Sequence, residues 1–354
     1  MEALVTDNFW RGRRVFLTGH TGFKGSWLAL RLSALGAETT GFALAPDTTP
    51  NLFTLARIAD TLTHIEGDIR DRAMFADTVR EARPEIVLHL AAQPLVRAGY
   101  AAPIETFTTN VMGTAHLLDA CRDLPGCRVI VVVTTDKVYR NLEHPYPYRE
   151  DEPLGGYDPY SASKAATEMV AACWRDSFLR KRGMAVATAR AGNVIGGGDW
   201  SPDRLLPDAV RAWEAGETLT VRRPDAVRPW QHVLEATNAY LMLSEALWRD
   251  PDLAGAWNFG PETGSAAIVR TVVELARKAY GAGDVLYGTE NSGPHEAGWL
   301  ALEIAKARQA LGFRPRWSLE EAVRRTMDWH RRLEEGADAR ALCADDARDF
   351  EAAA

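Results

Sequence analysis

Tyr160 and Lys164 stand four residues apart in the segment YSASK. On a helix, side chains with this spacing share one face. An ammonium group beside a phenol favours the phenolate and lowers the pKa of the tyrosine towards neutrality. Such a phenolate can accept the proton of a hydroxyl group while a hydride leaves the same carbon. The alternative is an amphipathic helix that carries this spacing by chance, and the motifs around it favour catalysis.

A glycine-rich loop, GHTGFKG at 19–25, follows an apolar run and precedes a helical pattern. In such a loop Gly19 permits a tight turn, Gly22 lets the backbone approach a pyrophosphate, and Gly25 lets the helix pack closely on the strand. The helix N-terminus offers free N–H groups and a partial positive charge to phosphates. The pattern therefore predicts a site for a dinucleotide cofactor.

The acid that usually binds the adenosine ribose, about 20 residues after the loop, is not found here. The second predicted strand runs into Ala45-Pro46 without an acid or an arginine, and Asp47 follows the proline. The sequence therefore leans to NAD without excluding NADP. Asp68, in EGDIRD, is placed to bind the adenine amino group or to cap a helix at 71–82, and both interpretations stay open.

The elements that must position these groups alternate between strand and helix in the first half. Apolar, β-branched runs predict strands at 13–19, 38–44, 62–68, 85–92, 128–136 and 184–190. Helical patterns lie between them at 25–35, 71–82, 103–121 and 160–181. This alternation predicts an α/β fold with a Rossmann-type doubly wound parallel sheet, which binds ligands at the carboxyl ends of its strands.

The pattern changes after Gly192, where segments are shorter and richer in Pro, Trp and Arg. Helices are predicted at 205–215, 232–248, 265–280 and 319–334, and strands at 218–222, 256–259 and 284–287. We therefore expect a cofactor-binding domain with the catalytic residues at 1–191. A smaller mixed α/β substrate lobe follows at 192–340 and can return a strand to the main sheet. The tail, 341–354, is either a peripheral helix or a frayed end.

Composition narrows the class of protein. The chain has 354 residues, 46% of them hydrophobic and 25% charged, with a formal net charge of -7. This is the balance of a globular protein, and it argues against nucleic-acid binding. The four cysteines form no CxxC pair, which excludes a disulfide scaffold, and no residues have the spacing of metal ligands. With no signal peptide and no apolar run of about 20 residues, we expect a cytoplasmic protein without membrane contact.

These motifs together resemble the extended short-chain dehydrogenase/reductases that modify nucleotide sugars, and among them the CDP-glucose 4,6-dehydratases. The resemblance spans nearly the whole chain. It is carried by GHTGFKG, by Tyr160 with Lys164, and by the blocks VVTTDKVY, RAGNVIGGGDWSPDRLLPD, RPWQHVLE, AWNFGP and PHEA. It implies NAD-dependent conversion of CDP-glucose into CDP-4-keto-6-deoxyglucose and water. It also implies a homodimer formed through the helices at 103–121 and 160–181.

The resemblance assigns roles to Thr135, Asp136 and Lys137, which end the most hydrophobic strand. Related dehydratases carry Thr-Asp-Glu here, and this chain has Lys in the third place. In the implied mechanism NAD accepts a hydride from C4 and returns it to C6, while Tyr160 accepts the 4-hydroxyl proton and Thr135 bonds near O4. Lys137 removes the C5 proton, and Asp136 protonates the departing C6 oxygen. Lys137 must then be neutral, which burial favours; the alternative is a strand-end ion pair.

The resemblance also implies binding residues. The cofactor contacts are expected at Gly19, Thr21, Gly22, Phe23, Lys24, Asp68, Ile69, Leu90, Ala91, Ala92, Thr109, Tyr160 and Lys164. The substrate contacts are expected at Gln93, Asn193, Arg204, Leu205, Arg228, Trp230 and His295. Arginine suits diphosphate oxygens, although surface ion pairs are the alternative. Trp200 and Trp230 could form walls of the base pocket, but packing inside the protein is the favoured role for both. His89 and His232 are expected to be structural.

Rival interpretations remain open from the sequence. A nucleotide-sugar 4-epimerase of the same fold would use Tyr160 and Lys164 but not Asp136 and Lys137, and its product would lose no water. A dehydratase of another nucleotide or sugar would share the whole site. A nucleotide-sensing protein without catalysis would bind NAD but turn over no nucleotide sugar.

Overall fold

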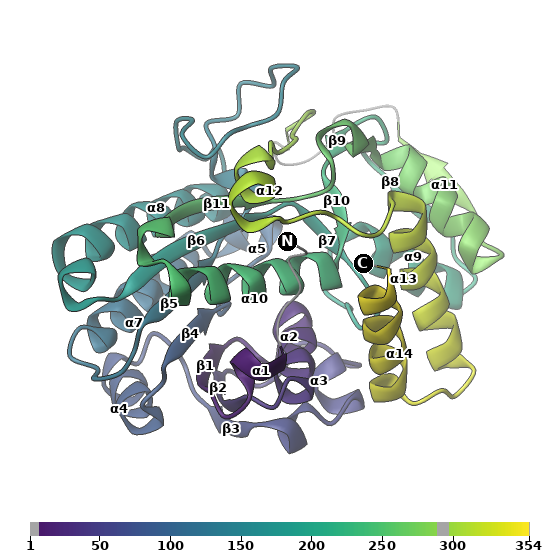
Figure 1. Ribbon diagram of the computed structural model, residues 1–354. Coiled ribbons are helices and arrows are strands. Elements are labelled where there is room, and N and C mark those ends of the chain that lie inside the picture. The colour runs from purple at the N-terminus through teal and green to yellow at the C-terminus, as the bar shows by residue number, and fades with distance from the viewer. Residues whose placement is uncertain (1–6, 289–296, 354) are drawn as a thin grey trace.

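The computed structural model describes residues 7–288 and 297–353 (Figure 1). Within these residues seven strands form a parallel sheet in the order β11-β6-β5-β4-β1-β2-β3. The strands are β1 Arg14–Thr18, β2 Glu38–Ala43, β3 Thr63–Glu66, β4 Ile86–His89, β5 Val129–Val133, β6 Ala185–Ala191 and β11 Gly255–Phe259. The chain order reverses between β1 and β4, and such switch points bind ligands in open α/β sheets.

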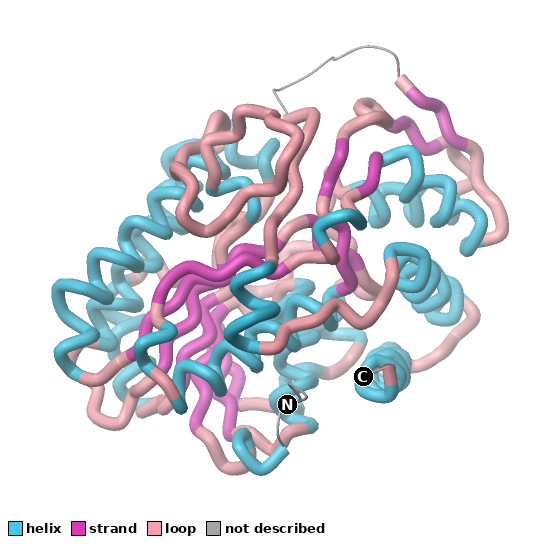
Figure 2. The backbone as a smooth tube through the Cα atoms, turned by 45° about the horizontal axis from the view of Figure 1, so that its top comes forward, coloured by secondary structure: helices cyan, strands magenta, loops and turns pink. Residues whose placement is uncertain are grey.

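Helices cover both faces of this sheet, as the magenta strands and cyan helices of Figure 2 show. One face carries α2 Phe23–Ala34 and α10 Val233–Arg249; the other carries α4 Arg72–Ala82, α7 Gly113–Cys121 and α8 Pro159–Trp174. The predicted α/β fold with a doubly wound parallel sheet is confirmed.

The apolar run of β5 explains this layering. Its side chains alternate between the faces, so Val129, Val131 and Val133 pack in the cluster with α2 and α10. Ile130 and Val132 pack in the cluster with α4, α7 and α8. A strand buried on both faces has no polar side, and this is why the sequence at 129–133 is continuously apolar.

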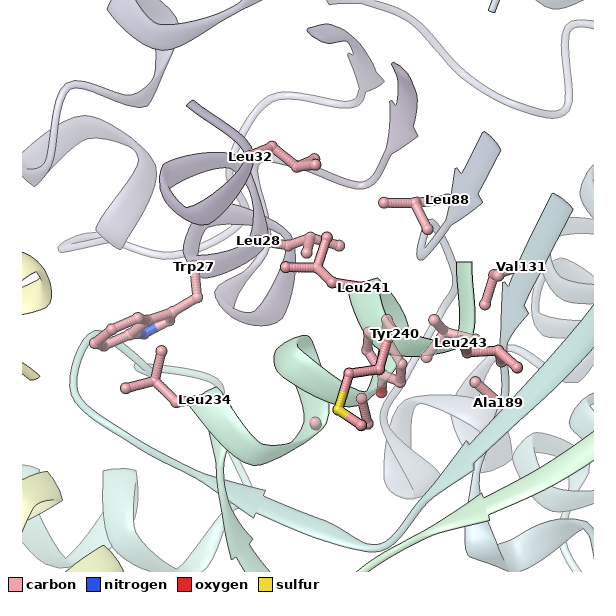
Figure 3. Packing of buried hydrophobic residues seen from close by; sticks show 14 of the residues in the cluster. Trp27, Leu28, Leu32, Leu88, Val131, Ala189, Leu234, Tyr240, Leu241 and Leu243 are labelled. Atoms are coloured by element: carbon pink, nitrogen blue, oxygen red, sulfur yellow. The ribbon is translucent and has the colours of Figure 1, made fainter. Parts of the chain in front are cut away.

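The second half of the chain contributes to the main sheet. The strand predicted at 256–259 is β11, which pairs in parallel with β6. Helix α10 lies against α2, and Figure 3 shows Leu241 of α10 beside Leu28 of α2 in one apolar cluster. The segment from α10 to β11 therefore lies with the first half of the chain in space. The division into two domains at 191 remains a proposal.

The remaining lobe is built from short paired strands and helices. Its strands pair as β7 Asn193–Ile195 with β10 Trp230–His232, β8 Leu219–Val221 with β13 Val285–Tyr287, and β9 Val227–Arg228 with β12 Ala267–Ile268. Its helices are α9 Leu205–Glu214, α11 Val269–Tyr280 and α13 Leu319–Glu334. The helix predicted from 265 begins at Val269, because Ala267 and Ile268 pair with β9.

Two predicted long helices contain π-helical turns. The segment predicted at 103–121 comprises α6 Pro103–Phe107, the π-turn η2 Thr108–Met112 and α7. The segment predicted at 160–181 comprises α8, the π-turn η4 Arg175–Leu179 and η5 Arg180–Arg182.

The tail forms α14 Ala339–Ala352, a packed helix with Leu342 and Phe350 buried. The other short segments are α1 Asp7–Trp10, α3 Leu52–Leu55, η1 Ile58–Thr61, α5 Val96–Ala101, η3 Asp136–Val138, η6 Pro251–Leu253, η7 Thr263–Ser265 and α12 Ala305–Leu311. In the described part of the chain, no helix has the length and apolar character needed to cross a membrane.

Candidate active site

The glycine loop joins β1 to α2 in a geometry that only small residues allow. Gly19 has a φ of 75°, in the left-handed region that favours glycine. A Cβ at Gly25 would lie 2.0 Å from the carbonyl oxygen of Gly19. Helix α2 starts at Phe23 without a side-chain cap on its free N–H groups. The loop therefore fits a pyrophosphate placed at the helix N-terminus.

The loop after β4 lies against the glycine loop. A Cβ at Gly19 would come within 2.7 Å of the Ala91 nitrogen. Thr18 Oγ1 accepts hydrogen bonds from the backbone nitrogens of Leu90 and Ala91, both at 3.1 Å. The same hydroxyl lies 2.7 Å from His89 Nδ1. Burial lowers the pKa of His89 to about 3, so its ring is neutral. Its bond with Thr18 holds the end of β4 to the end of β1.

Asp68 lies at the carboxyl edge of the sheet, but it does not cap a helix. Its carboxylate accepts hydrogen bonds from the Arg70 side chain, the shortest at 2.6 Å, and these hold its pKa below the usual value. The cap of α4 is Asp71, whose side chain accepts from Met74 N at 3.1 Å. The capping interpretation of Asp68 is therefore wrong. The neighbouring Ile69 is buried against Gly113, where a Cβ would lie 2.4 Å from its side chain.

Thr135, Asp136 and Lys137 form a tight turn directly after β5. Thr135 Oγ1 donates to Asp136 Oδ1 at 2.9 Å, and Lys137 Nζ lies 3.4 Å from the same oxygen. Asp136 is fully buried, and its Oδ2 has no partner among the described residues. The strand-end ion pair is present, and one carboxylate oxygen of Asp136 stays buried without a hydrogen-bond partner in the described chain.

Tyr160 and Lys164 lie on the first two turns of α8, both buried. Lys164 Nζ donates to the carbonyl of Val133, the last residue of β5, at 3.1 Å. Burial raises the pKa of Tyr160 to about 12, and a hydrogen bond with Thr135 only partly offsets this. Burial also lowers the pKa of Lys164 to about 8. The expected lowering of the tyrosine pKa is thus reversed in the protein alone, because desolvation favours the neutral phenol.

A cavity of about 870 Å³ opens at this edge of the sheet, between the two halves of the chain. From the first half it is lined by Lys24, Thr135, Lys137 and Tyr160. From the second half its lining includes the predicted substrate residues Asn193, Arg204, Leu205, Arg228 and Trp230. A volume of this size suits a ligand larger than a simple sugar.

The predicted substrate residues differ in how they are held. Arg204 pairs with Asp199 at 3.0 Å. Arg228 donates to the carbonyl of Val227 at 2.8 Å and to that of Ala297. Asn193 lines the cavity, and its Oδ1 is buried and bonds no atom of the described chain.

Other predicted residues lie apart from the cavity or outside the described ranges. The Gln93 side chain donates to Thr106 Oγ1 and accepts from Leu95 N, so it holds the loop that precedes α5. Thr109 lies half-buried in η2. Trp200 packs edge-on against Trp329, in line with a packing role. His295 lies outside the described residues.

The structure also brings groups to the cavity that the sequence analysis placed elsewhere or missed. Lys24 reaches the cavity, and burial with the nearby charges of Arg204 and Lys164 lowers its pKa to about 7. Arg97 of α5 and Asp203 form an ion pair at 3.2 Å across the two halves. Asp203 has a φ of 60°, unusual for a residue with a side chain. No local motif signals this pair, because its members lie on distant segments.

Comparisons with known proteins agree with this geometry. The chain is 45% identical over 343 residues, 95% of either chain, to the CDP-glucose 4,6-dehydratase of Salmonella typhimurium. It is 31% identical over 331 residues, 90% of this chain and 92% of the relative, to the dTDP-glucose 4,6-dehydratase of Streptomyces antibioticus. Among solved structures it is similar to DesIV, a dTDP-glucose 4,6-dehydratase from Streptomyces venezuelae with NAD and TYD bound. The TM-score is 0.76 at 25% identity, covering 91% of this chain and 98% of DesIV.

A family model described as GDP-mannose 4,6 dehydratase matches residues 16–326, which include both the glycine loop and the cavity. With most of the chain covered by one family model, and a relative that is nearly half identical over almost its full length, the chain belongs to the GDP-mannose 4,6 dehydratase family.

Proposed function

We propose that this protein is an NAD-dependent CDP-glucose 4,6-dehydratase that forms CDP-4-keto-6-deoxyglucose and water. The observation that carries the proposal is the pairing of the buried Asp136 with Lys137, in a turn whose Thr135 and Lys137 line the same cavity as Tyr160. An oxidation at C4 needs a base such as Tyr160, but elimination of water needs a further acid and base. The similarity to the Salmonella CDP-glucose 4,6-dehydratase supports the choice of nucleotide.

When bound, NAD accepts the hydride of C4 and returns it to C6 of the sugar. The residues that would hold it lie in the glycine loop after β1, in the segments after β3 and β4, in η2 and on α8. They are Gly19, Thr21, Gly22, Phe23, Lys24, Asp68, Ile69, Leu90, Ala91, Ala92 and Thr109, together with Tyr160 and Lys164. The uncapped start of α2, and the close approach of Gly25 to the Gly19 carbonyl that shapes the loop, support a pyrophosphate at this place.

The residues at the turn divide the proton transfers. Tyr160 accepts the 4-hydroxyl proton, and the ammonium of Lys164 stabilises the phenolate that results. The reaction begins from the form of the Lys137–Asp136 pair in which the proton has moved to Asp136, so that Lys137 is neutral. Lys137 takes the C5 proton, which the new ketone makes acidic, and returns it to C5 once the hydride has reached C6. Asp136 gives its proton to the departing C6 oxygen, which leaves as water.

The second half of the cavity would bind the nucleotide end of the substrate. Arg204 and Arg228 offer planar donor groups to the diphosphate, and Asn193 offers an amide. Leu205 and Trp230 provide apolar walls. Gln93 acts on the substrate only through the loop that it holds, and His295 stays a prediction.

We further propose a cytoplasmic homodimer. Ile104, Phe107, Met112 and Met169 are exposed, with Ile104 at 79%. They lie on α6, η2 and α8, which pack against one another. Exposed apolar side chains gathered on adjacent helices are typical of an interface, and a second copy of the chain would cover them. Size-exclusion chromatography with light scattering tests this, and an Ile104→Glu variant should run as a monomer.

Incubation with CDP-glucose, and in parallel with dTDP- and GDP-sugars, tests the activity. The expected product has lost one water by mass spectrometry and absorbs as a 4-keto sugar in alkali. Interconversion without loss of mass would instead indicate a 4-epimerase. NAD binding without turnover of any nucleotide sugar would indicate a nucleotide-sensing protein.

A further inference from the structure

Glu168, one helical turn beyond Lys164 on α8, is a buried carboxylate that the proposed mechanism does not use. Tyr160, Lys164 and Glu168 follow one another at four-residue spacing, so they lie along one face of the helix. Glu168 is 4% exposed. Its negative charge opposes the effect of burial on the pKa of Lys164.

Both oxygens of Glu168 are saturated with hydrogen bonds. Oε1 accepts from Thr134 Oγ1 at 2.5 Å and from Arg190 Nε at 3.0 Å. Oε2 accepts from Thr188 Oγ1 at 2.6 Å and from Arg190 Nη2 at 2.9 Å. A carboxylate bonded in this way to a guanidinium and two hydroxyls is fixed in place.

Arg190 extends this network past the catalytic turn. Its Nη1 donates to Tyr139 Oη at 2.8 Å, and Tyr139 Oη donates to Asn258 Oδ1 at 2.6 Å. Thr134 immediately precedes the turn at 135–138, and Tyr139 immediately follows it. The Glu168–Arg190 pair therefore bonds the residues on both sides of the turn.

We propose that Glu168 and Arg190 are positioning residues for the dehydratase reaction, whose buried ion pair fixes both ends of the catalytic turn and places a carboxylate one helical turn from Lys164. The pair acts through Lys164 and the turn. The inference rests on the proposed function for its effect on turnover, but its effect on Lys164 can be measured without substrate.

The test compares the parent protein with Glu168→Gln, which keeps the shape and removes the charge. The titration of Lys164 is followed by NMR of protein with ¹³C-labelled lysine, with the signal assigned from a Lys164→Arg variant. Loss of a nearby opposite charge should move this titration down by about one pH unit. The alkaline limb of kcat/KM for CDP-glucose should move in the same direction, with kcat falling more than KM changes.

Glu168→Asp separates the two parts of the proposal. It retains the charge, so Lys164 should titrate close to the parent. Its shorter side chain cannot hold both Thr134 and Thr188, so kcat should still fall. If Glu168→Gln does not fold, Glu168→Asp still tests the fixing of the turn: unchanged kcat in that variant would overturn it.

Glu245→Gln provides a matched control. Glu245 is a buried glutamate on α10 that bonds Trp10 Nε1 at 2.9 Å and Arg249 at 3.0 Å. This variant should lower the unfolding temperature without moving the Lys164 titration. An unchanged Lys164 titration in Glu168→Gln overturns the proposal, whatever the parent does with CDP-glucose. A shifted titration in a protein that makes no 4-keto sugar would contradict the proposed function and leave the role of Glu168 intact.

Discussion

Asp136 and Glu168 are carboxylates buried near the carboxyl end of the same strand, β5, and the surrounding chain treats them in opposite ways. Glu168 has hydroxyl and guanidinium donors on both of its oxygens. Asp136 has donors on Oδ1, while its Oδ2 lacks a partner within the described residues. Leaving a buried acceptor unbonded costs free energy. At Asp136 the unbonded oxygen belongs to a residue that the proposed mechanism uses.

This difference separates the reacting part of the site from the part that supports it. The turn at 135–137 is only half satisfied and lies at a cavity. The network of Glu168, Arg190 and Tyr139 is satisfied and closed to solvent. The comparison predicts that changes at the turn abolish chemistry with little loss of stability. Changes in the network should lower stability strongly and lower kcat only through the turn that the network fixes.

The strongest test of that comparison is Lys137→Met. We expect the dehydration rate to fall by about 10²–10⁴-fold, because the variant lacks the base for the C5 proton. The unfolding temperature should stay near that of the parent, since Lys137 is partly exposed. Mass spectrometry of the product measures the rate, and Lys278→Met, on an exposed lysine, is the control. Dehydration at the parent rate would show that Lys137 is not the base.

Arg190→Met tests the supporting network of Glu168, Arg190 and Tyr139. The variant strands Glu168 as a buried charge without its cation, which should lower the free energy of unfolding by about 3–5 kcal/mol. Urea denaturation measures this loss. The double variant Glu168→Gln/Arg190→Met should recover part of it, because no uncompensated charge remains. Arg331→Met, which breaks an exposed ion pair, should leave the free energy of unfolding close to that of the parent; equal losses in both single variants would contradict the distinction.

The sequence predicted the reacting groups better than the supporting ones. The glycine loop, the Tyr160–Lys164 spacing and the apolar strand before Thr135 are local patterns, readable within a few residues. Glu168 and Arg190 are bonded to each other across 22 positions, and neither stands in a motif that identifies its partner.

The direction of the shift in the pKa of Tyr160 could not be predicted from the local sequence either. The spacing to Lys164 is visible in the sequence, but the burial that raises the pKa of Tyr160 comes from the packed tertiary structure. The fold itself followed from strand–helix alternation. The return of α10 and β11 to the main sheet was only partly predicted, because the pattern after Gly192 does not show which surface each element covers.

Gly25→Ala tests whether the close contact between Gly25 and Gly19, which involves no charge, supports the proposed NAD site. The added Cβ would lie 2.0 Å from the Gly19 oxygen, so the loop must shift. Overpacking of this kind costs about 1–3 kcal/mol, which corresponds to roughly 5- to 150-fold weaker NAD binding if the whole cost falls on the NAD-bound loop. Calorimetric titration with NAD measures the change. Gly264→Ala, where the Cβ meets no described atom within 4 Å, should bind NAD as the parent does; parent-like affinity in Gly25→Ala would exclude the loop as the cofactor site.

Glu235, on the first turn of α10, is the intermediate case and gives the smallest effect. Its Oε1 accepts from Arg316 N at 2.7 Å and Trp317 N at 2.8 Å. Its Oε2 is unbonded in the described structure, and burial raises the pKa of Glu235 to about 7. Neither Glu235 nor its neighbours in the chain line the cavity, whereas Thr135 and Lys137 on either side of Asp136 do, so here the unbonded oxygen predicts a stability effect and no catalytic one.

The sign follows from proton linkage. Below pH 4.5 Glu235 is protonated in both the folded and unfolded chains, and between pH 4.5 and 7 the unfolded chain ionises first. The parent therefore loses stability in this range as pH rises, whereas Glu235→Gln does not. We expect Glu235→Gln to gain about 1–2 kcal/mol relative to the parent between pH 5 and pH 8, measured by urea unfolding. Glu320→Gln, at an exposed glutamate, should show no such gain. If Glu235→Gln shows none either, an unbonded buried oxygen carries no cost at that position, and the contrast between Asp136 and Glu168 must rest on the cavity alone.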